Sequence, residues 1–306
     1  MSIKKNNNET KLEPYVALMD PKVDYAFKQT FGNPKHPNIL ISFLNGVLGY
    51  TNKDDSEHIS KVVIENPQLD KTMLEDKYCI LDVRATLNTN EVINIEIQIK
   101  NPGSMINRLL YYLSKMLSNQ LCKKESYNNL KRCVSISVLN FDLIKNNRFH
   151  NIFNFRNKDD SELLSDLLEL HTVELPKLIR QKKLDTNDLL VDWALFLSNP
   201  ESDNVKVLQE RVPEIKEAME VLEMLSHNKE ARVIYEKRQQ ALRDKLSALN
   251  HEREEGRQEG RQEGEHNAQQ KIAIKMLVRG NDIADVAEYT ELSLEEVKKL
   301  QRKISH

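Results

Sequence analysis

Apolar and polar residues alternate with a period of two along residues 81–100, LDVRATLNTNEVINIEIQIK. This period predicts two β-strands joined by a short polar loop. The apolar face carries Leu81, Val83, Ala85 and Leu87 on the first strand and Ile93, Ile95, Ile97 and Ile99 on the second. The polar face carries Asp82, Arg84 and Thr86 on the first strand and Asn94, Glu96, Gln98 and Lys100 on the second.

The length of the loop predicts how the two strands pair. A three-residue turn over 88–90 sets Leu87 opposite Glu91, so Asp82 faces Glu96 with Cβ atoms about 5 Å apart. A slip of one residue would turn every isoleucine to the wrong face, so the register is well specified. Two carboxylates in this position repel each other unless something offsets their charge.

Two interpretations of this acidic pair remain open. A shared Mg²⁺ ion would cancel the repulsion, because hard cations prefer oxygen ligands, and it could activate a water and stabilise charge on a phosphoryl oxygen. Gln98, on the same face, could orient that water or contact phosphate, but it could not act as a strong base. Alternatively the polar face is solvated, and Arg84 neutralises the acids.

The rest of the pattern predicts an α/β protein. Helices are expected from Asp20-Pro21 to Gly32 and over 38–48, then a strand over 61–66 before the hairpin. A helix over 104–121 leads to a buried strand over 133–141, and 149–157 and 167–175 could be two further strands at a sheet edge. Helical patterns follow over 188–197 and 212–225. The order of helix, three strands, helix and strand is that of an α/β sandwich with a mixed sheet.

Beyond residue 229 the chain becomes helical and charged. The repeat EGRQEGRQEGE sets Gly256, Gly260 and Gly264 on one helix face, which fits either close contact with another helix or a solvated linker. The tail breaks at Gly280 and near Leu292, and a capping box at Ser293 begins its last helix. This helix-turn-helix-like tail suits phosphate contacts or, alternatively, packing and self-association, since its last helix carries Lys298, Lys299, Arg302 and Lys303.

Composition and cysteine spacing indicate the kind of protein but not its partner. The 306 residues carry a net charge of −2, which does not decide for or against a nucleic-acid partner. Cys79, Cys122 and Cys133 form no C-x-x-C pair and are expected to be reduced core residues of a cytoplasmic protein. Neither a signal peptide nor an apolar run of 18 residues is visible, so no association with a membrane is expected.

Charge is uneven along the chain. Residues 100–148 hold nine basic residues against Glu125 and Asp142, with tyrosines interleaved. Basic and aromatic side chains beside a metal site suit the backbone of a nucleic acid, although a solvated helix face with half-buried tyrosines gives the same pattern. We expect DNA contacts from Lys100, Arg108, Tyr112 and Lys115.

Several motifs taken together resemble one protein family. Asp82 followed by Glu96-Ile97-Gln98 is similar to the PD-(D/E)XK nuclease motif, with glutamine in place of the usual lysine. MDPKVDYAFKQTFG, FLNGVLG, RLLYYLSKMLSNQL, HTVELPK and the glycine-glutamate repeat add to this likeness. Together they resemble the recombination-promoting nuclease/putative transposase family, over about residues 19–300.

That resemblance implies a restriction-endonuclease-like αβββαβ core and Mg²⁺-dependent cleavage of DNA, with Mn²⁺ as an alternative ion, linked to recombination and mobile elements in bacteria. It implies that Asp82 and Glu96 bind the metal, that Gln98 takes the place of the lysine, and that Asp24 supplies a further acid. An ion pair with Lys28 is the alternative role for Asp24. Glutamine removes the positive charge that the lysine brings near the attacking water, whereas the two metal ligands are kept.

Three functions follow from these expectations. The first is a metal-dependent endonuclease, the second a DNA-binding or self-associating protein with a vestigial nuclease site, and the third a transposase that adds strand transfer to cleavage. A homodimer is expected, because of the long helix. The expected parts are a disordered N-terminus (1–18), a nuclease domain (19–225), a long charged helix (226–270) and a small helical C-terminal segment (271–306).

Overall fold

The computed structural model describes residues 16–52, 56–65, 83–88, 90–181, 184 and 187–304. The chain divides into two compact units, Met1–Gln239 and Gln240–His306, which are described separately here. Most of the segment expected to be disordered, residues 1–15 of 1–18, lies outside the described residues. The other domain boundaries expected above stay predictions.

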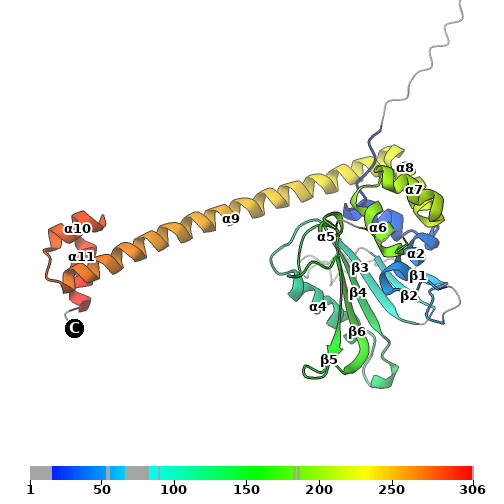
Figure 1. Cartoon of the computed structure of the whole chain (residues 1–306), viewed down its shortest axis with the longest axis horizontal. Helices are drawn as coiled ribbons and strands as arrows, with labels where there is room; N and C mark the ends of the chain where they lie inside the picture. Colours follow the sequence, from blue (N-terminus) through cyan, green and yellow to red (C-terminus); the bar gives the residue numbers. More distant parts are fainter. Residues whose placement is uncertain are drawn as a thin grey trace, which may run out of the picture. The chain divides into compact units, whose positions relative to one another are not determined.

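The first unit is built on a mixed six-stranded sheet in the order β1-β2-β3-β4-β6-β5 (Figure 1). β3, β4 and β6 are parallel to one another, whereas β1, β2 and β5 pair with their neighbours in the antiparallel sense. The α/β class and the predicted order of helix, three strands, helix and strand are thereby confirmed. The strands are β1 (Val62–Glu65), β2 (Val83–Leu87), β3 (Val92–Gln98), β4 (Cys133–Leu139), β5 (His150–Arg156) and β6 (Leu163–Glu174).

The predicted hairpin register is confirmed over every pair that the structure describes. Val83 pairs with Ile95 and Thr86 with Val92, as the three-residue turn requires. The turn closes with Asn90 in the left-handed region, at φ 64°, where asparagine is tolerated better than most residues. Asp82, the predicted partner of Glu96, lies outside the described residues, so their pairing stays a prediction.

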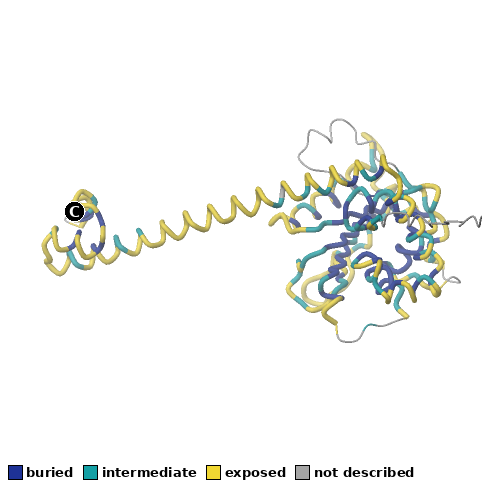
Figure 2. Tube along the Cα trace, turned by 90° about the horizontal axis from the view of Figure 1, so that it is seen from above, coloured by how far each residue is buried: buried dark blue, intermediate teal, exposed yellow. Residues whose placement is uncertain are grey.

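Helices cover one face of the sheet, where α1 (Asp24–Phe31), α2 (Pro37–Leu48), α6 (Leu189–Ser198) and α8 (Pro213–His227) pack together. Aromatic rings fill the layer: the Phe31 ring centroid lies 5.4 Å from that of Trp193, whose indole donates to Ser42 Oγ. Figure 2 shows buried segments in this unit, in contrast to the exposed middle of α9. Ile93, Ile95 and Ile97 of β3 point into this core.

α4 (Met105–Ser118) covers the opposite face of the sheet. Its Leu109, Leu113 and Met116 pack with Val92 and Cys133 in a second apolar cluster. The polar face of the predicted hairpin is therefore covered, so the expectation of a solvated sheet face is wrong for β3, all but one of whose residues are buried.

Several local predictions need correction. The first helix begins at Asp24, because Asp20 Oδ1 accepts from Lys22 N in a local turn that the helix does not continue. The short helices α5 (Leu175–Ile179) and α7 (Asp203–Arg211) were not predicted. Cys133 is buried, but Cys122 is exposed, so it is not a core residue; Cys79 lies outside the described residues.

The second unit holds residues 240–278 of α9 (Lys229–Val278), with α10 (Ile283–Thr290) and α11 (Leu294–Ile304). Ala273, Val286 and Val297 are at the centre of its own small core. The predicted capping box is confirmed, since Ser293 N donates to Glu296 Oε2 and Glu296 N donates to Ser293 Oγ. No helix in the described ranges combines the length and apolar content that crossing a membrane requires.

Candidate active site

Glu96 is a buried carboxylate at the centre of the sheet. It lies on β3 opposite Ser137 of β4, on the face that α4 covers, and is 1% exposed. Arg108, from the first turns of α4, donates from Nη2 to Glu96 Oε2 over 3.0 Å. A glutamate in this position is costly unless it is paired, and Arg108 provides that pair.

The second oxygen of Glu96 is left open. Oε1 has no hydrogen-bond partner among the described residues, and neither do the two amide atoms of Asn94, two residues earlier on the same face of β3. Burial raises the pKa of Glu96, and Arg108 opposes the rise. The Ser137 hydroxyl, which faces Glu96 without completing a hydrogen bond to it, opposes the rise as well. Buried polar atoms without partners are rare and mark a site at which a ligand, ion or water is expected.

The other predicted site residues have different positions. Gln98 is at the end of β3, two residues beyond Glu96 on the same face, and pairs in register with Leu139. Asp24 begins α1, where its Oδ1 accepts from Tyr25 N and its Oδ2 lies 3.9 Å from Arg238 Nη1. Among the described residues, Asp24 makes these two contacts. It forms neither the expected ion pair with Lys28 nor a bond to Glu96.

The four residues expected to contact DNA divide into two groups. Lys100 is exposed and Lys115 half-exposed, with Nζ of Lys115 5.7 Å from the centre of the Tyr111 ring. Tyr112 is buried, and Arg108 is turned toward Glu96 with its guanidinium 5.7 Å from the centre of the Tyr112 ring. Tyr111 is exposed and Tyr112 is buried, so the expected face of half-buried tyrosines is not found on this helix.

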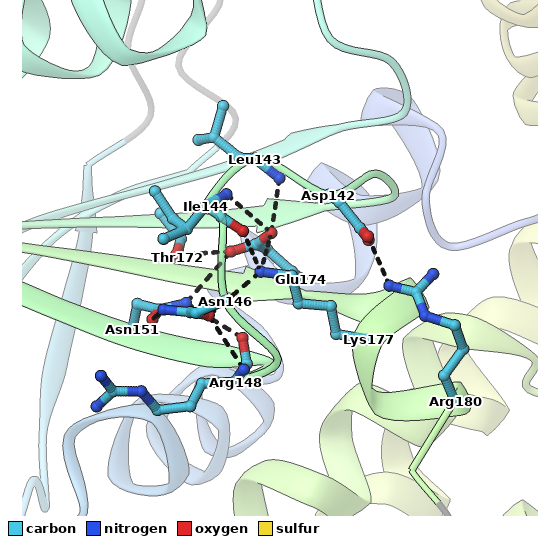
Figure 3. A network of polar contacts seen from close by, with 10 residues as sticks. All are labelled: Asp142, Leu143, Ile144, Asn146, Arg148, Asn151, Thr172, Glu174, Lys177 and Arg180. Atoms are coloured by element: carbon cyan, nitrogen blue, oxygen red, sulfur yellow. Dashed lines mark hydrogen bonds and ion pairs between the residues drawn. The ribbon is translucent and has the colours of Figure 1, made fainter.

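A second buried glutamate gives a comparison for Glu96. Glu174, at the end of β6, is fully buried on the same face, and its oxygens accept from two backbone amides, from Lys177 and from Asn151 (Figure 3). Lys177 Nζ also donates to the carbonyl of Ile144. These bonds hold the 142–148 segment against the sheet, so Glu174 has a structural role. Within the part of the chain that the structure describes, the side chain of Glu96 has one bond, from Arg108.

The positions of Arg108 and Asn94 at the site were not predicted from the sequence. Arg108 was expected to contact phosphate, but it pairs with Glu96, and Asn94 was placed on the polar face without a role. The spacing of Arg108 and Tyr112, four apart on one helix face with buried Leu109 beside them, was a signal that both turn inward. No signal in the sequence gave the partner of Arg108.

The residues present fit a hard cation. Glu96 offers an unpaired carboxylate oxygen and Asn94 an unpaired amide oxygen, which are donor types that Mg²⁺ accepts. No group of three or more His, Cys, Asp or Glu side chains that could hold a metal ion occurs among the described residues, a set that excludes Asp82.

The chain matches a known protein family over most of its length. A family model described as PD-(D/E)XK nuclease family transposase matches residues 21–252, which include the whole sheet and most of the helices around it. Neither the curated proteins nor the solved structures gave a match. The match spans well over half of the chain, and the chain therefore belongs to the PD-(D/E)XK nuclease family transposases.

Proposed function

We propose that this protein is a Mg²⁺-dependent DNA endonuclease that hydrolyses phosphodiester bonds during recombination or the movement of mobile elements. The observation that carries the proposal is the Glu96 carboxylate, which is buried at the sheet centre and has one oxygen without a partner. Membership of a nuclease family supports the reaction class and a DNA substrate.

In this proposal Asp82 and Glu96 hold the metal ion, with Mn²⁺ as a substitute. The hairpin register supports the pairing, because each described pair has the spacing that sets Asp82 opposite Glu96. The ion, when bound, activates water and stabilises charge on the phosphoryl group. Water adds to phosphorus as the bond to O3′ breaks, which leaves a 3′-hydroxyl and a 5′-phosphate.

The chain's own residues position the substrate. Gln98, at the end of β3, is placed beyond Glu96 on the same face and orients the water or a phosphate oxygen. Lys100 follows the strand end and Lys115 lies three turns along α4, so both can contact the DNA backbone. Asp24 is included as a further acid because of its resemblance to the family motif; in the structure it contacts Tyr25 N and lies near Arg238.

The second unit supports an alternative function in another class. Lys298, Lys299, Arg302 and Lys303 of α11 are all exposed, which suits contact with phosphates. A DNA-binding protein with a vestigial nuclease site would use this helix. The main proposal includes a homodimer in the cytoplasm. Strand transfer after cleavage is compatible with it.

Cleavage of supercoiled plasmid tests the two functions against each other. If the protein is a nuclease, it should nick or linearise the plasmid with Mg²⁺ and leave it intact with EDTA. DNA ligase should then seal the cut ends directly, because it needs a 5′-phosphate beside a 3′-hydroxyl. Folded protein that retards the plasmid in a gel without cutting it, with Mg²⁺ or with Mn²⁺, would favour the binding protein and contradict the proposal.

A further inference from the structure

We propose that Arg108 is a positioning residue that supplies, from helix α4, the fixed positive charge that the neutral Gln98 does not bring to the motif. The inference rests on the proposed nuclease function. It assigns a role in the reaction to a residue outside the motif strands.

The first step concerns the charge that is missing. A lysine in the place of Gln98 would bring one positive charge to the end of β3, near the attacking water. Gln98 has an amide, which can donate and accept hydrogen bonds but has no charge to stabilise a developing negative charge. A cation from another element would restore that electrostatic contribution.

The second step concerns which cation is available. Arg84, which pairs with Asn94 of β3, has its Nε 2.9 Å from Glu65 Oε2 on β1. Arg108 Nη2 lies 3.0 Å from Glu96 Oε2. Among the described residues, Arg108 is thus the cation in contact with the candidate metal ligand.

The third step is that Arg108 is held in place. Its side chain is 20% exposed, its guanidinium lies over the Tyr112 ring, and its Nη2 donates to Glu96 Oε2. A charge that is partly removed from water acts more strongly on its neighbours than an exposed one does. The contact uses Oε2 alone, so Arg108 fixes the carboxylate and leaves Oε1 open for the metal ion.

Charge rescue separates this role from a purely structural one. Arg108→Met should lower the single-turnover cleavage rate about 100-fold at saturating Mg²⁺, the usual cost of one preorganised electrostatic group. Arg108→Lys should recover most of that rate. In a Gln98→Lys background, Arg108→Met should cost tenfold or less, because the charge is again present. An equal loss in both backgrounds would overturn the proposal.

Metal binding gives a readout that does not depend on cleavage. Mn²⁺ binding, measured by electron paramagnetic resonance without DNA, should be about tenfold tighter in Arg108→Met, because a cation beside the ligand has been removed. If thermal melting shows that Arg108→Met does not fold, Arg108→Gln is measured in its place. Unchanged or weaker Mn²⁺ binding, or no binding by the wild type, would overturn the role of Arg108.

The two readouts also separate this proposal from the proposed function. If the wild type binds Mn²⁺ but cleaves no plasmid, the proposed nuclease function fails. The change in Mn²⁺ affinity in the Arg108 variants then still decides whether Arg108 places its charge on the metal ligand.

Discussion

Glu96 and Glu174 are both buried on the same face of the sheet, but their oxygens have opposite surroundings. Glu174 is bonded on both oxygens by amides, Lys177 and Asn151, whereas Glu96 has one bond from Arg108 and an open Oε1. A fully bonded buried carboxylate stabilises a fold, and one with an open oxygen is available to a ligand. Of the two, Glu96 is the one that belongs to the motif seen in the sequence.

Removing Lys177 should destabilise the protein without a direct effect on the site. Lys177→Met leaves the Glu174 charge buried without its cation, which is expected to cost about 3–5 kcal/mol. For a domain of this size that corresponds to a fall in Tm of about 6–20 °C. Thermal melting followed by circular dichroism measures it, with the exposed Lys206→Met as control, and a fall below 2 °C would contradict the structural role.

Stability should fall as the pH drops from about 6.5 to about 4 because of His150. Its Nε2 lies 2.9 Å from His171 Nδ1, and burial, followed by the charge of His171, lowers the pKa of His150 to about 4. The unfolded chain takes up a proton near pH 6.5 and the folded chain does not, so the folded state loses up to about 3 kcal/mol over this range. Above pH 6.5 both states are neutral and the contribution is zero.

Urea unfolding at several pH values checks this expectation. The difference in unfolding free energy between the wild type and His150→Gln should change between pH 7.5 and pH 4.5, with the variant losing less stability on acidification. Parallel pH profiles for the two proteins would show that His150 is not the group responsible.

Replacing the glycines of α9 should stabilise the helix. A Cβ at Gly256, Gly260 or Gly264 meets no atom within 4 Å, and each alanine gains about 1 kcal/mol of helix propensity. The triple alanine variant should therefore raise the helical signal and the melting temperature of α9. Sedimentation serves as the test of the other interpretation: if the glycines form a helix-to-helix contact between chains, the variant will lose a dimer that the wild type forms.

The structure explains which features the sequence predicted and which it did not. The hairpin register was predictable, because a period of two and a three-residue turn are local and leave one pairing that buries the isoleucines. The start of α1 was not, because a turn at Asp20 resembles a helix cap. α7 was missed because Val205 and Leu208 are its only buried residues, too few for a visible period.

The candidate site was predictable where it depends on one strand and not where it depends on tertiary packing. Glu96 and Gln98 follow from the motif on one strand. The contact of Arg108 with Glu96 depends on how α4 rotates above the sheet, which the packing of Leu109 and Leu113 on Val92 and Cys133 decides. Such tertiary packing has no short-range signature in the sequence.

Asp82 should be as necessary as Glu96 if the two share a metal ion. Asp82→Asn removes the charge with little change in size, so the apparent Mg²⁺ requirement for plasmid nicking should rise at least tenfold. Titration of the nicking rate with Mg²⁺ measures the effect. A variant with the wild-type Mg²⁺ dependence would show that Asp82 is not a metal ligand.

The most direct test of the central claim compares two glutamates on one face of the sheet. Glu96→Gln keeps the shape of the buried side chain and removes its charge, and Glu65→Gln makes the same change at the half-exposed partner of Arg84. Single-turnover plasmid nicking with Mg²⁺ should fall at least 100-fold in Glu96→Gln, with the circular dichroism spectrum unchanged, and less than threefold in Glu65→Gln. Nicking by folded Glu96→Gln at the wild-type rate would contradict the claim that this carboxylate carries the reaction.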